Sequence, residues 1–160
     1  MRKAVGAVIG FSLLLMAQTI TMPMWLPFGF IPDLLLLTII LVGFLKPSGQ
    51  AFWLGLILGL FQGWIQGRCW WAFAISRSFA SVLAGWMKNK WLWQSPPAAG
   101  FCAAVTTIAA ETVLAILLAI SERSLTPFKL LLPTGVFETT VNAVLGFVIL
   151  QLWFPKEAAV

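Results

Sequence analysis

Three ionisable side chains stand inside long apolar stretches of this 160-residue chain, at Arg77, Glu111 and Glu138. A charge at the centre of a bilayer costs at least about 2.5–3.5 kcal/mol, so such residues usually face the interior of a helix bundle or a partner protein. Because an arginine can bridge two carboxylates through its forked donors, we expect these three residues to form one buried cluster. Asn142 lies four residues after Glu138, on the same face of a helix, and extends the cluster.

This charge cluster allows three interpretations. The first is a proton or ion relay, and the second is a structural clamp that fixes three helices against one another. In the third, one of the glutamates faces a helix of a partner protein. We favour the clamp, because the chain contains no histidine and no second basic residue at comparable depth.

No other group of residues has the composition of a catalytic or metal site. Ser76 and Ser78 flank Arg77, but no base accompanies them. The lack of histidine removes the usual general base and the usual zinc ligand. Cys69 and Cys102 lie in different apolar segments and are expected to pack as small hydrophobic side chains, with a disulfide as the alternative. We therefore predict that the protein is not an enzyme and has no catalytic residue, metal site or cofactor.

The elements that position these residues are predicted to be membrane-spanning helices. The chain is 61% hydrophobic and 9% charged, with a mean hydropathy of +0.98. Soluble domains carry about 25% charged residues, so this chain cannot cover a water-facing surface. The fold class is therefore predicted to be all-α, an integral membrane bundle in a single domain over residues 1–160. Its six spans are expected at about residues 4–22, 28–45, 51–66, 69–87, 98–120 and 133–154.

The ends of these spans carry two further expectations. Residues 1–22 have the basic start and apolar run of a signal peptide, but the run is long, so we expect an uncleaved first helix. The last apolar stretch begins at Pro127 and exceeds the length of a span. We expect Pro133 to divide it into a short interfacial piece and a spanning helix.

The basic residues set the orientation. With both termini cytoplasmic, the inner face holds more lysine and arginine than the outer face, as the positive-inside rule requires. The inner set is Arg2, Lys3, Lys46, Lys88, Lys90 and Lys156, and the outer set is Arg68, Arg123 and Lys129. Because these charges are spread along loops, the net charge of +5 does not indicate nucleic-acid binding.

A glycine series marks the segment between Lys46 and Arg68. Glycine recurs at every fourth position, which places the series on one helix face. In a bilayer such a face lets another helix approach backbone to backbone, so we expect a central helix with closely packed neighbours. The packing residues are Gly55, Gly59 and Gly63, and Gly67 is expected to end the helix.

The N-terminal part of the chain offers candidate partner contacts. Gly6 and Gly10 give the first helix a small-residue face, which suits helix packing or docking. Pro32 fits the first turn of the next helix, and Asp33 sits where the helix dipole favours an anion. We favour Asp33 as an anchor of the helix start, with contact to a basic residue of a partner as the alternative. Trp25, Pro32 and Asp33 are the partner-contact candidates in the outer turns.

Three local patterns resemble the bacterial rod shape-determining protein MreD family. They are the Pro-Asp entry into a leucine-rich helix at residues 32–37, the glycine helix at 55–67, and the final helix LLPTGVFETTVNAVLG with its Leu-Pro pair and Asn142. The resemblance covers nearly the whole chain, and its motifs are made mostly of leucine, glycine and proline. The chain departs from the family in having Gly63 where an acidic residue is usual and Trp71 where a glycine is frequent.

The resemblance implies a fold similar to the substrate-binding subunits of energy-coupling-factor vitamin transporters. It also implies a non-catalytic subunit of the cell-wall elongation machinery in the bacterial cytoplasmic (inner) membrane. Such a protein binds MreC and, through it, RodA, its class B penicillin-binding partner and, indirectly, MreB. The alternatives are the substrate-binding subunit of a vitamin transporter, which needs a polar pocket on the outer side, and a small proton-coupled carrier that uses the buried charges.

Overall fold

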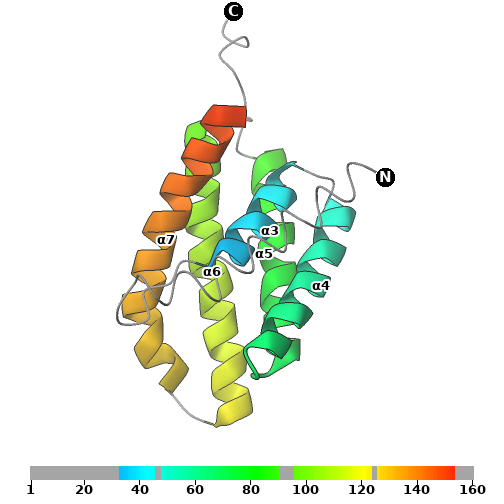
Figure 1. The fold of residues 1–160 in the computed structure, drawn as a ribbon, viewed down its shortest axis with the longest axis vertical. Coiled ribbons are helices and arrows are strands. Elements are labelled where there is room, and N and C mark those ends of the chain that lie inside the picture. The colour runs from blue at the N-terminus through cyan, green and yellow to red at the C-terminus, as the bar shows by residue number, and fades with distance from the viewer. Residues whose placement is uncertain (1–32, 46–47, 91–95, 124–125, 154–160) are drawn as a thin grey trace, which may run out of the picture.

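The computed structural model describes residues 33–45, 48–90, 96–123 and 126–153, and every element in these ranges is an α-helix (Figure 1). The helices are α3 (Leu34–Leu45), α4 (Ser48–Ile65), α5 (Trp70–Lys90), α6 (Pro96–Glu122) and α7 (Thr126–Trp153). The all-α prediction is confirmed for this part of the chain. The first predicted span, with Gly6 and Gly10, and the candidates Trp25 and Pro32 lie outside the described residues.

The described helices form two antiparallel pairs around a short central helix. Figure 1 shows α6 beside α7 and α4 beside α5, with α3 between the pairs. Helix α3 is apolar on all sides, and such a helix is stable only when it is buried. Its side chains Leu36, Ile39, Ile40 and Phe44 are at most 1% exposed and pack against small residues of α5 and α6. Within the described residues, α3 is therefore the central helix, and the expectation that the glycine helix takes this place is wrong.

The glycine face of α4 meets the backbone of α5. A Cβ atom added at Gly55 or Gly59 would lie 2.6 Å from a backbone oxygen, that of Arg77 or Phe73 respectively. One added at Gly63 would lie 2.5 Å from the Cα of Trp70. No side chain fits at these distances, so the three glycines permit the close approach that the sequence predicts. Gly43 of α3, which the sequence did not single out, lies equally tightly against the backbone of Ser81.

Gly67 ends α4 as predicted. Its φ of +62° lies in the left-handed region, which glycine adopts without steric cost. The N–H of Gly67 donates to the carbonyl oxygen of Trp64 (3.1 Å), and the N–H of Arg68 donates to that of Gly63 (3.2 Å). These two bonds form a Schellman motif, which satisfies carbonyls at the helix end and turns the chain directly into α5.

Helix α7 runs without interruption from Thr126 to Trp153, so the expected division at Pro133 is wrong. A proline inside a helix removes one backbone hydrogen bond, at a cost of roughly 3 kcal/mol. Packing against neighbouring helices can offset that cost in a bundle. Glu138 and Asn142 both lie on this continuous helix, which packs along α6.

One helix of the described residues, Pro97–Glu122, is long and apolar enough to cross a membrane by its length and composition. Three further apolar stretches, which lie within α3, α4 and α7, are shorter. They are Leu34–Phe44, Gly49–Ile65 and Gly135–Ile149.

Candidate functional site

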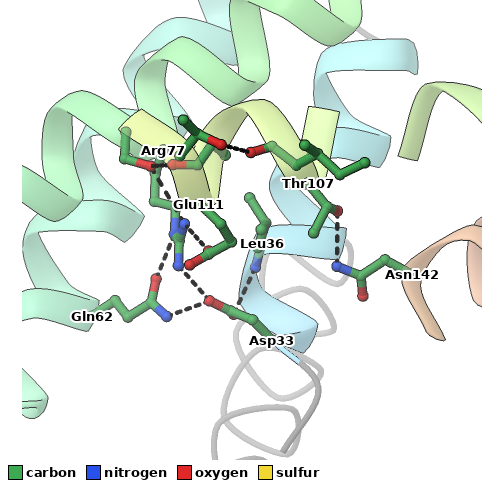
Figure 2. Close-up of polar contacts among 11 residues, drawn as sticks. Asp33, Leu36, Gln62, Arg77, Thr107, Glu111 and Asn142 are labelled. Carbon is green, nitrogen blue, oxygen red and sulfur yellow. Dashed lines mark hydrogen bonds and ion pairs between the residues drawn. The ribbon is translucent and has the colours of Figure 1, made fainter. Parts of the chain in front are cut away.

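Arg77 is the centre of the candidate site. It lies on α5 and is 1% exposed, the largest of the fully buried side chains in the described residues. The guanidinium cannot be left without partners away from water, because desolvation of an unpaired charge costs several kcal/mol. All three of its nitrogens are in fact engaged by side chains from other helices (Figure 2).

Two carboxylates pair with Arg77. Its Nη2 lies 2.5 Å from Oδ2 of Asp33, and its Nη1 lies 2.8 Å from Oε1 of Glu111. The expected pair with Glu111 is present, and it joins α5 to α6. The pair with Asp33 joins α5 to the start of α3, across 44 positions of sequence.

Gln62 completes the network from α4. Its Oε1 accepts a hydrogen bond from Nε of Arg77 (2.9 Å), and its Nε2 donates to Oδ2 of Asp33 (2.6 Å). The amide thus supplies one acceptor to the cation and one donor to the anion. Gln62 was not among the predicted site residues, although a glutamine in a long apolar helix is itself a signal that a buried polar partner is present.

Asp33 anchors α3. Its Oδ1 accepts a hydrogen bond from the backbone N–H of Leu36 (2.9 Å), the geometry of an N-cap, so the favoured interpretation of this residue is confirmed. The residue is buried, and its second oxygen is held by Gln62 and Arg77. The alternative role as a partner contact does not fit this structure, because a carboxylate occupied inside the bundle is not accessible to another protein.

The two polar residues of α7 are placed differently from Glu111. Asn142 is fully buried and donates through Nδ2 to Oγ1 of Thr107 on α6 (3.1 Å), and it does not contact Arg77. Its Oδ1 has no hydrogen-bond partner among the residues that the structure describes. Glu138 is half-buried and lies within electrostatic range of Arg77 and Glu111, but no hydrogen bond or ion pair involves its carboxylate among the described residues. The structure therefore brings three of the four cluster candidates near one another, and pairs only two.

A cavity of about 240 Å³ opens beside this network. It is lined by residues of α4, α5, α6 and α7, by Asp33 just before α3, and by the turn after α4. The polar wall is Asp33, Gln62, Gln66, Arg68, Arg77, Glu111 and Glu138, and the apolar wall is Phe73, Leu114, Ala115, Leu118 and Pro127. Gln66 and Arg68 are exposed and mark the mouth, on the side of the α4–α5 turn, whereas Arg77 and Gln62 lie buried at its base.

The chemistry available at this cavity is binding through charge and hydrogen bonds. Ser76, beside Arg77, donates its hydroxyl to the backbone oxygen of Ala110 (2.7 Å), so it is a link between α5 and α6. Cys69 and Cys102 are both free thiols. In the described part of the chain, no group of three or more His, Cys, Asp or Glu side chains is placed to hold a metal ion.

No protein-family model, curated protein or solved structure matches the chain. The resemblance to the MreD family therefore rests on the residues of the chain alone.

Proposed function

We propose that the protein is a multi-pass protein of the bacterial cytoplasmic membrane, with six spans and both termini in the cytoplasm. The observation that carries this proposal is the inverted distribution of side chains. Arg77 is buried, whereas Trp64 is 74% exposed and Trp53 is 62% exposed. In water this arrangement would expose large aromatic surfaces, whereas in a bilayer those surfaces face lipid.

The exposed tryptophans support the same placement. Trp64 and Trp70 flank the turn between α4 and α5, and Trp53 and Trp86 lie toward the opposite ends of these helices. At 1.5 Å per residue, Trp70 and Trp86 are about 24 Å apart along α5. Tryptophan is enriched at both interfaces of a membrane, which a hydrocarbon core of about 30 Å separates.

Within this membrane, we propose that the protein acts as a non-catalytic scaffold of the cell-wall elongation machinery. It binds MreC and, through MreC, joins RodA, the class B penicillin-binding partner of RodA, and MreB. The residues that carry the resemblance to MreD have structural roles where they are described: Asp33 caps α3 and holds Arg77, and Gly59 lets α4 pack on α5. A frame of this kind presents helix faces to other membrane proteins.

The experiment that tests this function is capture of the full-length protein from its native membrane in mild detergent. MreC and RodA are expected in the captured fraction, identified by mass spectrometry, and depletion of the protein from a rod-shaped host is expected to round the cells. The matched variants are Gly10→Leu, on the small-residue face of the predicted first helix, and Gly49→Ala, where an added Cβ meets nothing within 4 Å. Gly10→Leu is expected to lower the yield of MreC, and Gly49→Ala is expected to leave it unchanged. Normal cell shape after depletion contradicts the proposal.

The polar cavity favours a second candidate, the substrate-binding subunit of a vitamin transporter. The cavity opens beside the α4–α5 turn, which is an outer turn in the proposed orientation. Its volume of about 240 Å³ is below the range of roughly 300–1,000 Å³ that small-molecule sites occupy, so we rank this candidate second. Capture of an ATPase pair with a transporter subunit, in place of MreC, would favour it.

A further inference from the structure

Helix α3 fills one half of the centre of the described bundle. It begins after Asp33, its N-cap, which is paired with Arg77. From this level it packs against α5 at Ala80 and Ala84, which follow the arginine, and against residues 98–110 of α6. Figure 1 shows α3 beginning partway along α5 and α6. Helix α3 therefore does not reach the other half of the centre, which lies toward the α4–α5 turn.

The cavity of about 240 Å³ lies in that other half. Its lining residues on α5 and α6 start at the level of the arginine and continue toward the turn. They are Phe73, Arg77, Glu111, Leu114, Ala115 and Leu118. Exposure changes along the α4 wall, because Gln62 is 3% exposed whereas Gln66, four residues later, is exposed. The cavity is therefore open at the end of the α4–α5 turn and closed at the level of the arginine.

The cavity has the size and the polarity that water requires. A water molecule occupies about 30 Å³ in the liquid, so a cavity of about 240 Å³ holds several, each of which needs roughly two to four polar partners. One such partner is the carboxyl group of Glu138, which has no hydrogen bond or ion pair with a described residue. In either protonation state, a carboxyl group without a partner is unfavourable away from water. Ionisable residues of membrane helices commonly face a water-filled cavity for this reason.

From the position of α3, the graded exposure and the polar wall together, we propose that the cavity is a water-filled vestibule. It opens beside Gln66, hydrates Glu138 and ends at Arg77. From Leu118 to Glu111 it extends about 10 Å along α6. Its direction rests on the proposed topology, in which the α4–α5 turn is an outer turn. Small hydrophilic solutes of the outer aqueous phase can therefore reach the site without crossing lipid.

The test is cysteine accessibility in the full-length protein, in sealed right-side-out membrane vesicles. The background variant carries Cys69→Ser and Cys102→Ala, which removes both cysteines of the chain. The probe is a methanethiosulfonate with a trimethylammonium group, which is charged and does not cross the membrane. Because the thiolate is the reactive form of cysteine, the probe modifies thiols that water reaches. Mass spectrometry measures the modified fraction over time.

Four single-cysteine variants of α6 compare the vestibule with its surroundings. Leu118→Cys and Ala115→Cys lie on the vestibule wall and are expected to be modified, the first faster because it is nearer the mouth. Ile116 is 43% exposed on the outside of the bundle, and Ala110 is fully buried in the cluster around α3. Cysteines at these two positions are expected to react at least about tenfold more slowly, because apolar surroundings suppress the thiolate. In denaturing detergent all four are expected to react equally.

Two outcomes would overturn the proposal. If Leu118→Cys and Ala115→Cys react as slowly as Ile116→Cys, the cavity is dry. If all four variants react equally without denaturant, the bundle opens as a whole and has no defined vestibule. Leu114→Cys, also on the wall, replaces either vestibule variant that does not fold. Modification of the wall positions in inverted vesicles alone would support the vestibule and contradict the proposed topology.

Discussion

The α4–α5 interface and the α7 side of the cavity are packed in different ways. At the first, Gly55, Gly59 and Gly63 meet the backbone of α5. At the second, Glu138 lines the cavity without a hydrogen bond or ion pair to any described residue, and Oδ1 of Asn142, one turn further along α7 and outside the cavity lining, also lacks a donor in the described part of the chain. Arg77 lies between these regions and is fully engaged by Asp33, Gln62 and Glu111.

The two regions differ in whether their groups already have partners within the chain. The glycines of α4 make their close contact with the backbone of α5, inside the same chain. These residues are therefore important for stability and are not free to bind anything else. A polar side chain without a partner has no hydrogen bond to lose, so its replacement is expected to change stability little. The comparison therefore predicts large losses of stability at Arg77 and at the glycines, and a small change at Glu138.

The largest expected effect belongs to Arg77→Leu. Removing the guanidinium leaves the carboxylates of Asp33 and Glu111 buried without a counter-charge, and breaking a buried pair in this way costs about 3–5 kcal/mol in soluble cores. The free energy of unfolding of the variant in detergent is the measurement. A loss below about 1 kcal/mol, the range of surface pairs, would show that the network is not a clamp.

Gly59→Leu is expected to follow, with a loss of about 3 kcal/mol, the upper end for overpacking. Even the Cβ atom lies too close to the backbone of Phe73, so α4 and α5 must separate. The matched control is Gly49→Ala in the same helix, where the added methyl group meets open space and should leave unfolding nearly unchanged. Equal unfolding free energies for the two variants would remove the argument for close packing.

Gln62→Leu tests the bridge between anion and cation. It deprives Arg77 of an acceptor and Asp33 of a donor, and leaving such buried groups unsatisfied costs about 2 kcal/mol. Gln66→Leu, four residues later in the turn after α4 and exposed, serves as the control and should be close to neutral. A thermal melt of both variants in the same detergent distinguishes them, and identical curves would contradict the assigned role of Gln62.

Glu138→Gln is expected to have the smallest effect, within about 1 kcal/mol of the wild type, because no hydrogen bond or ion pair of the described residues is lost. The amide is uncharged, so it avoids the repulsion that an ionised carboxylate would meet there from Glu111 and Asp33. Denaturant unfolding of the purified variant is the measurement. A loss as large as that of Arg77→Leu would mean that Glu138 has a strong partner, and the comparison would fail.

The sequence predicted the features that depend on short-range spacing. Glycine at every fourth residue indicated the seam of α4, and a glycine before Arg68 indicated the helix end. The rarity of charge in apolar stretches predicted that Arg77 pairs with Glu111 or Glu138, and the structure pairs it with Glu111. Each of these inferences needs only helix periodicity or the high cost of an unpaired buried charge.

The features that depend on how helices are arranged were not predicted. Asp33 was assigned to a helix start, and nothing local shows that its second oxygen reaches an arginine 44 residues away. Gly43 stands alone, without a glycine one turn before or after it, so no periodic signal marked its contact with Ser81. Pro133 was given the local effect of a proline, whereas the packing of α7 along α6 keeps the helix continuous.

The most direct test of the account is a pair of double-mutant cycles around Arg77, measured as free energies of unfolding. One cycle combines Arg77→Leu with Glu111→Gln, and the other combines Arg77→Leu with Glu138→Gln. The account predicts a coupling of about 1–3 kcal/mol in the first cycle and less than about 0.5 kcal/mol in the second, because of these two glutamates the structure bonds Glu111 to the arginine and not Glu138. Strong coupling to Glu138 with none to Glu111 would contradict it.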